Sequence, residues 1–261
     1  MNAGELLTHS LSPDHATRQA AEQALEAAAR DSYPMYMTSL SSEMASEAAL
    51  VHIRTASGLA LKNALVAREA RRAQDYADRW TALSAEARDQ VKSKVLMTLS
   101  SSEPRAGTVA AQVTAAIAAI ELPRGMWPDL VSQLLAAIGD LHNPCQRQAA
   151  LQAIGFTCEV VDPAVLAAQS NEILTAVIQG ARKEETSPEV QLAALRALLN
   201  SLEVIDISNN LGDAKSLITH PATSTHKSME PADRAAIGLG DDMLRLSVGL
   251  EHVGDLIADL E

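Results

Sequence analysis

The feature that most limits the fold of this chain is a series of paired apolar helices that repeats from the N-terminus to Glu203. Within each predicted helix, Ala and Leu recur at the spacing of one helical face. Because a single pair cannot bury its own apolar face, a period of roughly 40 residues indicates stacked pairs that rely on their neighbours. Prolines beside capping residues separate the pairs, at Ser12-Pro13, Tyr33-Pro34, Trp127-Pro128 and Asp162-Pro163.

The breaks give the expected limits of the helices. A short helix at 2–9 precedes one at 13–30, for which Ser12 is the predicted N-cap. A charged segment at 68–84 interrupts the pattern after the second pair, which opens at Tyr33-Pro34. The later helices are expected at 84–101, 105–121, from Trp127-Pro128 onward, 144–160, 163–181 and 188–202.

Each predicted helix has an inward face made of small or branched apolar residues. The faces of the first two pairs comprise Ala20, Ala21, Leu25, Met37, Leu40, Met44, Ile53, Leu59 and Leu65. Hairpins that are adjacent in the sequence account for every apolar face, which disfavours a compact bundle. The sequence therefore predicts an all-α, HEAT-type right-handed solenoid of about five helical hairpins over residues 1–203.

The sequence changes character after Glu203. VIDIS (204–208) and MLRLSVGL (243–250) are rich in β-branched and apolar residues and predict strands, whereas 230–238 and 252–261 predict helices. Residues 204–261 are too few to build a domain core of their own. We therefore expect a short α+β fragment that is partly disordered or docked on the exposed end of the solenoid.

Composition excludes several classes of protein. Aromatic residues make up 2% of the chain, which suits helices packed through small side chains rather than a sheet sandwich. A net charge of −12 argues against a nucleic-acid partner and favours a basic one. Cys145 and Cys158 match no zinc pattern and no disulfide framework, so we expect two reduced thiols.

The N-terminus and the apolar runs indicate a location. The first residues are too polar for a signal peptide, and no apolar run reaches the ~18 residues of a membrane span. We therefore expect no membrane partner, and a protein of the cytoplasm and the nucleus.

Seven ordered blocks in residues 1–203 carry a family resemblance. They are LSPD (11–14), GLALKNAL (58–65), RW (79–80), WPDLVSQLL (127–135), QAIGFTC (152–158), QSNEILTAVIQGARKEE (169–185) and ALLNSLE (197–203). Together they resemble the N-terminal HEAT repeats of the importin β family of nuclear import receptors. The resemblance implies binding of the GTPase Ran in its GTP form, through the second helices of the early repeats.

The resemblance also implies contact residues. Arg54, Lys62 and Asn63 fall in the matching block IRTASGLALKNAL and are the candidates for the GTPase. A lysine and an arginine on a concave surface suit the acidic side of a GTPase. The alternatives are that Asn63 caps a neighbouring turn and that Lys62 is a solvated flank.

A second implied partner is the Phe-Gly repeats of nucleoporins. Leu174, Thr175 and Ile178 match the family's half of that pocket, and this partner would place the chain at the nuclear pore. The alternative is that the apolar arc of EILTAVIQG, which also contains Ile173 and Val177, is core. No binding of importin α is expected, because the family's site for it lies beyond these repeats.

Residues 204–261 resemble a different family. NNLGDAKSLITHPATSTH (209–226) and RLSVGLEHVGDLIADLE (245–261) resemble the C-terminal end of the Cys/Met-metabolism enzymes that use pyridoxal phosphate (PLP), of the O-acylhomoserine sulfhydrylase type. The resemblance implies that Arg245 is a vestigial ligand of the substrate carboxylate and that Asn210 lines the same pocket. His220 and His226 are expected to be held by loop and strand hydrogen bonds rather than to form a catalytic or metal pair.

The enzyme chemistry is not expected in this chain. It needs a Schiff-base lysine, a phosphate cradle and an acidic partner for the pyridine nitrogen, which the family carries in a domain without counterpart here. Lys215 does not hold the family's Schiff-base position. We therefore expect no catalysis, no bound PLP and no metal.

Three functional hypotheses follow. The first is a nuclear transport receptor fragment that binds Ran and Phe-Gly nucleoporins. The second is an inactive fragment of a PLP-dependent sulfhydrylase. The third is a chimera that joins two coding sequences at NSLE|VIDIS, through gene fusion or an error in the gene model.

Overall fold

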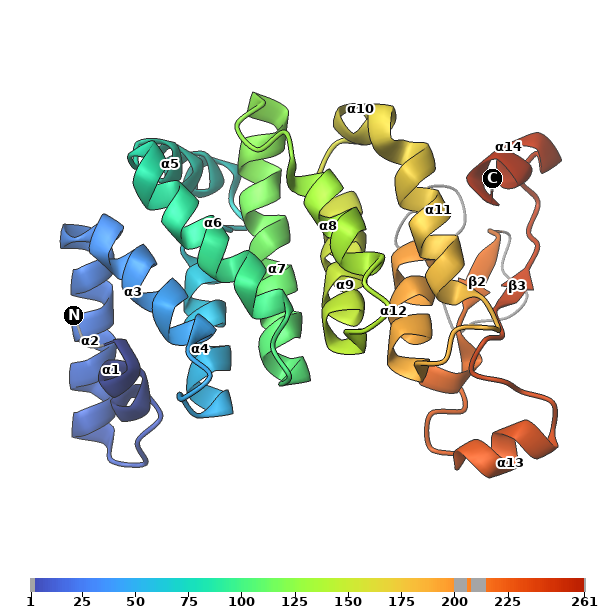
Figure 1. The fold of residues 1–261 in the computed structure, drawn as a ribbon, viewed down its shortest axis with the longest axis horizontal. Helices are drawn as coiled ribbons and strands as arrows, with labels where there is room; N and C mark the ends of the chain where they lie inside the picture. The colour runs from blue at the N-terminus through green and yellow to red at the C-terminus, as the bar shows by residue number, and fades with distance from the viewer. Residues whose placement is uncertain (1–2, 200–205, 208–214, 261) are drawn as a thin grey trace.

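The computed structural model describes residues 3–199, 206–207 and 215–260. Residues 3–199 form a row of helices, here called the solenoid, and residues 206–207 and 215–260 form a small mixed element, here called the tail (Figure 1). The helices of the solenoid are α1 (Ala3–Ser10), α2 (His15–Asp31), α3 (Tyr33–Ala45), α4 (Val51–Asn63), α5 (Ala70–Thr81), α6 (Ala85–Leu99), α7 (Pro104–Glu121), α8 (Leu130–Ile138), α9 (Pro144–Val160), α10 (Pro163–Leu166), α11 (Ser170–Ala181) and α12 (Pro188–Leu199). Two 3₁₀ turns join them, η1 (Leu122–Arg124) and η2 (Ala167–Gln169).

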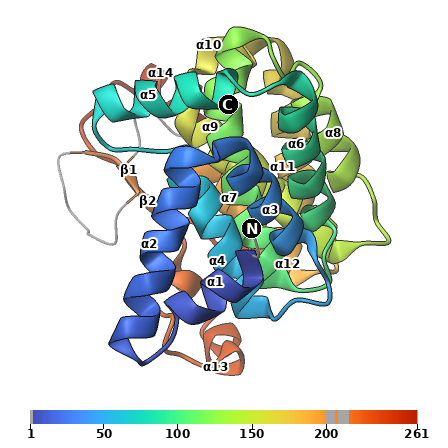
Figure 2. The same cartoon turned by 90° about the vertical axis from the view of Figure 1, so that its left-hand side faces the viewer.

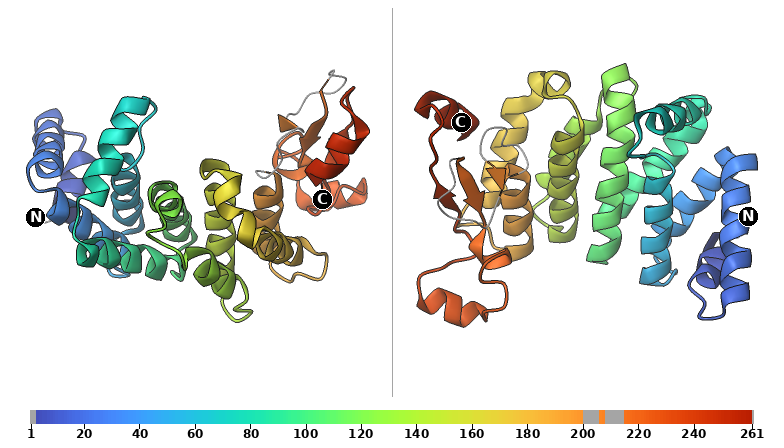
Figure 3. Two further views of the ribbon diagram at one scale, coloured as in Figure 1. Left: turned by 90° about the horizontal axis from the view of Figure 1, so that it is seen from above. Right: turned by 180° about the vertical axis from the view of Figure 1, so that it is seen from behind.

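The helices are arranged as stacked hairpins. The pairs α3–α4, α6–α7, α8–α9 and α11–α12 pack internally, and each pair packs on the next through α3 on α6, α4 on α7, α7 on α9 and α9 on α12. Viewed from above, the row forms an arc (Figure 3, left), and the second helices line its inner side. The predicted all-α solenoid of about five hairpins is therefore confirmed.

One continuous apolar core runs through the solenoid from Ala3 to Ala197. Helix α7 is its centre, and small residues there allow neighbouring helices to approach closely. A Cβ placed at Gly58 would lie 2.6 Å from the side chain of Val109, so this position requires glycine. Among the described residues, one helical segment, Pro104–Arg124, is long and apolar enough to cross a membrane. However, 72% of its most apolar stretch is buried in the solenoid, as expected for a core helix.

The structure corrects several helix limits. Helix α2 begins at His15, because Asp14 rather than Ser12 is its N-cap and accepts a hydrogen bond from the Thr17 amide. The predicted helix at 163–181 is divided into α10, η2 and α11. The charged segment at 68–84, expected to interrupt the pattern, contains helix α5.

Two residues of the predicted inward faces are wrong. Ala20 is exposed on α2, and Leu59 is 42% exposed on α4, where the predicted Ile53 is buried together with Ser57 and Leu61. Some apolar residues of α4 lie outside the stripe that packs against its neighbours, so the positions of apolar residues predicted a buried face that is too wide.

Helix α5 projects from the layered hairpins on the inner side of the arc (Figures 2 and 3). Its last turn fixes it to the rest of the solenoid. The guanidinium of Arg79 lies 4.3 Å from the ring centroid of Tyr33 and donates a hydrogen bond to the carbonyl oxygen of Ala29. Burial raises the pKa of Tyr33 to about 12. Trp80, at the same end of α5, is fully buried.

The tail contains a three-stranded sheet in the order β1-β2-β3. Strand β1 (Asp206–Ile207) pairs parallel with β2 (Leu217–Thr219), and β2 pairs antiparallel with β3 (Arg245–Ser247). The 3₁₀ turn η3 (Pro221–Thr223) and the helices α13 (Pro231–Ala236) and α14 (Val253–Leu260) complete it. The predicted strands and helices of the tail are confirmed within narrower limits, whereas β2 was not predicted.

The tail lies beside the last hairpin, next to α12 (Figure 1). Leu195 of α12 is buried although it is not part of the continuous core. Buried residues of the tail, such as Leu217, Ile218 and Leu256, also lie outside that core. The tail thus lies beside the end of the solenoid, whereas its buried residues do not belong to the solenoid's core. The predicted boundary between Glu203 and Val204 lies outside the described residues.

Candidate protein-binding site

Arg54, a predicted GTPase contact, lies inside the second hairpin. Its Nε donates to the carbonyl oxygen of Met44 at 2.9 Å, and its two terminal nitrogens donate to the two carboxylate oxygens of Glu47, each at 2.9 Å. The Arg54 side chain is 2% exposed. This guanidinium also holds the pKa of Glu47 below its usual range through the side-chain hydrogen bond. The geometry gives Arg54 a structural task in the α3–α4 turn.

A second arginine repeats this arrangement. Arg147 is the fourth residue of α9, as Arg54 is the fourth of α4. Its Nε donates to the carbonyl oxygen of Ile138, the last residue of α8, at 3.0 Å, and its terminal nitrogens bind the carboxylate of Glu185 at 3.0 and 2.5 Å. Each arginine therefore ties the start of a second helix to the end of the first helix. The recurrence supports a role in the hairpin for Arg54 rather than in a partner contact.

Lys62 and Asn63 are the last two residues of α4. The Nζ of Lys62 donates to the Oε1 of Gln112 on α7 at 3.0 Å, so it bridges two second helices. Asn63 is exposed, as are the apolar side chains of Leu59 and Val66 on either side of it. Together these residues form a surface with a cation, an amide and apolar groups, here called the α4 surface (Leu59, Lys62, Asn63 and Val66).

Helix α11 divides its apolar arc between core and surface. Ile173 and Val177 are buried and belong to the continuous core. Leu174 is half-buried, Thr175 is exposed and Ile178 is 44% exposed. The three predicted nucleoporin contacts thus share the accessible side of α11. The alternative, that the whole apolar arc is core, holds only for Ile173 and Val177.

A buried polar cluster joins α5, α6 and α7. The carboxylate of Glu121, which is fully buried, accepts hydrogen bonds from Nε1 of Trp80 at 2.9 Å and from Nζ of Lys92 at 3.0 Å. Nε of Arg88 lies 3.4 Å from the same carboxylate, and the Lys92 ammonium lies 5.1 Å from the centroid of the Trp127 ring. Sequence reasoning missed this cluster. Its one signal was an isolated glutamate at the end of the apolar helix α7.

In the tail, both histidines considered in the sequence analysis make hydrogen bonds within the tail. The ring nitrogens of His220 lie 2.8 Å from Oγ1 of Thr223 and 2.7 Å from the carbonyl oxygen of Asp241, and Nδ1 of His226 lies 2.9 Å from Oγ1 of Thr225. The expectation that loop contacts hold both histidines is therefore confirmed. The part of the chain that the structure describes contains no group of three or more His, Cys, Asp or Glu able to hold a metal ion.

Of the two residues predicted for the vestigial substrate pocket, the structure describes Arg245. Arg245 begins β3, opposite Thr219 of β2. Asn210 lies outside the described residues.

Comparison with known proteins identifies relatives of the solenoid. Residues 21–101 match the model of the importin-beta N-terminal domain. The importin subunit beta-1 of Schizosaccharomyces pombe is 52% identical over 205 residues, which are 78% of this chain and 24% of that relative. The solenoid matches importin β.

Two solved structures of relatives share the fold of this importin-β-like solenoid. One is described as Kap95p, whose binding induces the switch loops of RanGDP to adopt the GTP-bound conformation; it is 39% identical with a TM-score of 0.73, over 76% of this chain and 23% of that chain. The other is a Kap95:Nup1 complex, also 39% identical, with a TM-score of 0.71 over 76% of this chain and 24% of that chain.

The tail has a separate set of relatives. Residues 167–261 match the model of the Cys/Met metabolism PLP-dependent enzymes. The O-succinylhomoserine sulfhydrylase of Mycobacterium tuberculosis is 66% identical over 64 residues, which are 24% of this chain and 16% of that relative. The matched range includes α11 and α12, but both helices contribute to the continuous importin-β-like core, so we assign the enzyme match to the tail. The chain spans about a quarter of the importins and about a sixth of the sulfhydrylase.

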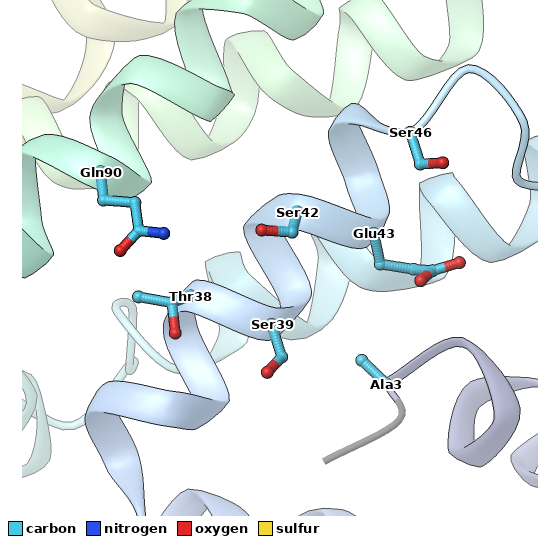
Figure 4. A pocket seen from close by; sticks show the side chains of 7 residues that line it. All are labelled: Ala3, Thr38, Ser39, Ser42, Glu43, Ser46 and Gln90. Atoms are coloured by element: carbon cyan, nitrogen blue, oxygen red, sulfur yellow. The ribbon is translucent and has the colours of Figure 1, made fainter.

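The importin-β-like solenoid also contains a polar cavity of 440 Å³ between α1, α3 and α6 (Figure 4). Hydroxyl groups of α3 line it around the carboxylate of Glu43. The complete lining is Ala3, Thr38, Ser39, Ser42, Glu43, Ser46 and Gln90. It includes none of the predicted contact residues on α4 and α11.

Proposed function

We propose that this chain is a nuclear transport receptor fragment that binds the GTPase Ran in its GTP form. The observation that carries the proposal is the 52% identity to an importin subunit beta-1 over 205 residues, or 78% of this chain. The relative described with RanGDP shares this fold. The cytoplasm and the nucleus are the compartments that this function requires.

The α4 surface supports the proposal chemically. Gln112 accepts one hydrogen bond from the Lys62 ammonium, which has three donors and therefore keeps capacity for an acidic partner. The amide of Asn63 is accessible next to it, and Leu59 and Val66 supply apolar contact area. A cation held in place by a neighbouring helix loses less side-chain entropy on binding than a mobile one. Arg54 contributes indirectly, by holding the α3–α4 hairpin that presents these residues.

The accessible side of α11 supports a second contact of the same receptor. Leu174 and Ile178 offer apolar surface one turn apart, with the methyl group of Thr175 beside them. Such an arc suits the phenyl ring of a Phe-Gly repeat. A relative has been solved as a complex with Nup1. We include Phe-Gly nucleoporins, and hence the nuclear pore, in the proposed function, and we do not include importin α.

A titration of Ran into the full chain tests the proposal. Ran loaded with GTP is expected to bind, and Ran loaded with GDP is expected to bind more weakly. Lys62→Glu reverses the charge of the α4 surface and is expected to weaken binding at least tenfold. Lys183→Glu makes the same change at an exposed lysine in the α11–α12 turn and is expected to leave binding unchanged. Equal effects of the two substitutions, or no binding by a chain whose circular dichroism is helical, would refute the proposal.

We further propose that the tail neither binds PLP nor catalyses a reaction. A Schiff base needs a lysine next to a phosphate-binding loop. The tail's two lysines are Lys215 and Lys227, of which Lys227 is exposed in a turn. The pKa of Glu251 is lowered mainly by the backbone hydrogen bond from Ser216, with a smaller contribution from the charge of Lys215. The family resemblance does not place the Schiff-base lysine at Lys215. Equilibrium dialysis of PLP against the full chain is expected to show no saturable binding, and saturable binding lost in Lys215→Ala would contradict this.

The chimeric origin of the chain is a separate proposal. It is supported by matches to two unrelated families, at residues 21–101 and 167–261. Sequencing the transcript across codons 199–208 tests it. One continuous message establishes a fusion, and two separate messages remove the tail from the protein.

A further inference from the structure

The polar cavity between α1, α3 and α6 has the size of a binding site for an organic group. Its volume of 440 Å³ lies within the range of about 300–1,000 Å³ that is typical of small-molecule sites, whereas a single water needs about 10–15 Å³. The α3 side chains of the lining lie between Gln90 of α6 and Ala3 of α1 (Figure 4). Three helices therefore build the cavity, and the contacts between them fix its shape.

Most polar side chains of the lining have no partner inside the protein. The exception is Thr38, whose hydroxyl donates to the carbonyl oxygen of Pro34 at 2.9 Å. The other polar side chains of the lining make no hydrogen bond or ion pair with any residue that the structure describes. Ser39, Glu43 and Ser46 are half-buried. Because buried polar groups are normally satisfied, these groups are available to a polar ligand.

Glu43 supplies the one charge of the lining. Its carboxylate lies against the first turn of α1, since a Cβ placed at Gly4 would be 2.6 Å from its Oε1. Two cations of α6, Arg88 and Lys92, pair with the carboxylate of Glu121 instead. The carboxylate of Glu43 is thus held in position and has no positive partner among the residues of the described ranges.

The composition of the lining argues against several classes of ligand. The lining contains no basic residue, so a phosphate or carboxylate ligand would meet only the negative charge of Glu43. It contains no aromatic residue on which a planar ring could stack. A calcium ion takes about six to eight oxygen ligands, usually from several carboxylates, and the lining has a single one. An organic cation remains.

We propose that this cavity binds a primary ammonium group on an aliphatic stem, as carried by a lysine side chain or a free diamine. An ammonium has three donors, which suits serine hydroxyls placed around one carboxylate. A guanidinium fits less well, because it favours both oxygens of a carboxylate, and both oxygens of Glu43 lie within 3.0 Å of the Cβ position at Gly4. The proposal is independent of the GTPase and nucleoporin contacts, whose residues are not part of the lining.

Heteronuclear NMR titrations of the full chain test the proposal and distinguish the two sources of the ammonium. The probes are putrescine and an acetyl-Gly-Lys-Gly-amide peptide, and the control is the same peptide with norleucine in place of lysine. The amines are expected to cause saturable shifts of the backbone amides of Ser39, Ser42, Ser46 and Gln90. The norleucine peptide is expected to cause none. Tighter binding of the peptide than of putrescine would identify a protein lysine as the ligand, and the reverse order a free diamine.

Two variants test the roles of charge and space. Glu43→Gln keeps the shape of the side chain and removes its charge, so it is expected to weaken binding about fivefold or more. Ser42→Leu, at an exposed position of α3, keeps the charge and fills part of the cavity, and it is expected to abolish binding without loss of helix. The matched control is Glu22→Gln at an exposed carboxylate of α2, which is expected to leave binding unchanged.

Three results would overturn the proposal. The first is the absence of saturable shifts with either amine while circular dichroism shows a helical chain. The second is an equal response to the norleucine peptide, which would make the stem rather than the ammonium the bound group. The third is unchanged affinity for the amines in folded Glu43→Gln or in folded Ser42→Leu.

Discussion

The solenoid and the tail are stabilised in different ways, although they are parts of one chain. The solenoid has a single core in which each hairpin covers the next, from Ala3 to Ala197. The tail has few buried apolar residues and is held by polar contacts such as those between Ser216 and Glu251. The solenoid's apolar stripes face inward, whereas the stripe of α14 faces solvent.

This difference reflects how far the contacts of each kind of fold reach along the chain. A solenoid needs only its nearest neighbours, so a run of repeats keeps its packing when later repeats are absent. A piece of a mixed α/β domain depends on contacts that are distant in the sequence, and it loses them when the rest is absent. Substitutions in the two regions should therefore have effects of different size.

The largest effect is expected for Glu121→Ala. Removing this carboxylate leaves the Lys92 ammonium and the Trp80 indole without their buried acceptor, which should cost about 3–5 kcal/mol of unfolding free energy. Asp89→Ala is the matched control, because Asp89 also pairs with Lys92 but is 70% exposed, and it should cost about 1 kcal/mol or less. Urea unfolding followed by circular dichroism measures both. Similar costs would show that the cluster does not hold the solenoid.

A somewhat smaller effect is expected for Glu185→Ala, about 3 kcal/mol, because the Arg147 guanidinium would be left buried without its partner. Glu47→Ala, which removes the 60% exposed partner of Arg54, should cost about 1 kcal/mol. If Glu47→Ala is the more costly, the last hairpin is less dependent on its ion pair than the second.

The Arg147–Glu185 ion pair makes the stability of the fold depend on pH. The Arg147 hydrogen bond lowers the pKa of Glu185, so the unfolded chain binds this proton more readily than the folded one. The stabilisation is therefore complete above the usual carboxyl range and is lost as the pH falls through the lowered pKa. Glu185→Gln should flatten this acid dependence, as measured by thermal unfolding between about pH 2 and 6.

Close packing between repeats predicts an intermediate effect for Gly155→Ala. The new Cβ would lie 3.0 Å from Cα and 3.1 Å from Cβ of Ala197, so α9 and α12 must separate, at a cost of about 1–2 kcal/mol. Gly139→Ala is the control, because the nearest atoms to its Cβ would be backbone oxygens at 3.4 and 3.6 Å, and its φ is −72°. It should change stability by less than about 0.5 kcal/mol. A neutral Gly155→Ala would indicate that the two helices separate freely.

The smallest global effect is expected for Glu251→Ala in the tail. Unfolding of the solenoid should be unchanged, while hydrogen exchange at 216–219 should become faster because both Ser216 hydrogen bonds are lost. The amide hydrogen bond of Ser216 lowers the pKa of Glu251, so protection in the wild-type tail should fall as the pH drops through that lowered value. Asp255→Ala, at an exposed neighbouring carboxylate, should alter neither. A shift of the solenoid transition by Glu251→Ala would show that the two regions unfold together.

The hairpins could be predicted from the sequence because their determinants are local. Helical periodicity and the proline breaks placed α6, α7 and α9 within a few residues of their limits. The burial of Ile173 and the exposure of Ile178 on α11 could not be separated in this way, since both residues are equally apolar and only packing on neighbours distinguishes them.

The features that sequence reasoning missed depend on partners distant in the chain. Helix α5 is charged and resembles a linker, yet Arg79 and Trp80 anchor it to residues of α2, α3 and α7. The structural role of Arg54 could not be predicted, because it depends on the Met44 carbonyl and the Glu47 carboxylate lying around the same guanidinium in the folded hairpin. Strand β2 of the tail is defined by its pairing with β1 and β3, which its own three residues do not reveal.

The most direct test of the account is the affinity for Ran loaded with GTP, measured by calorimetric titration into the full chain and into a chain that ends at Glu203. The account predicts the same affinity for the two, because the α4 surface and the continuous core belong to the solenoid. Binding that requires the tail, or no binding by either chain while both remain helical, would contradict it.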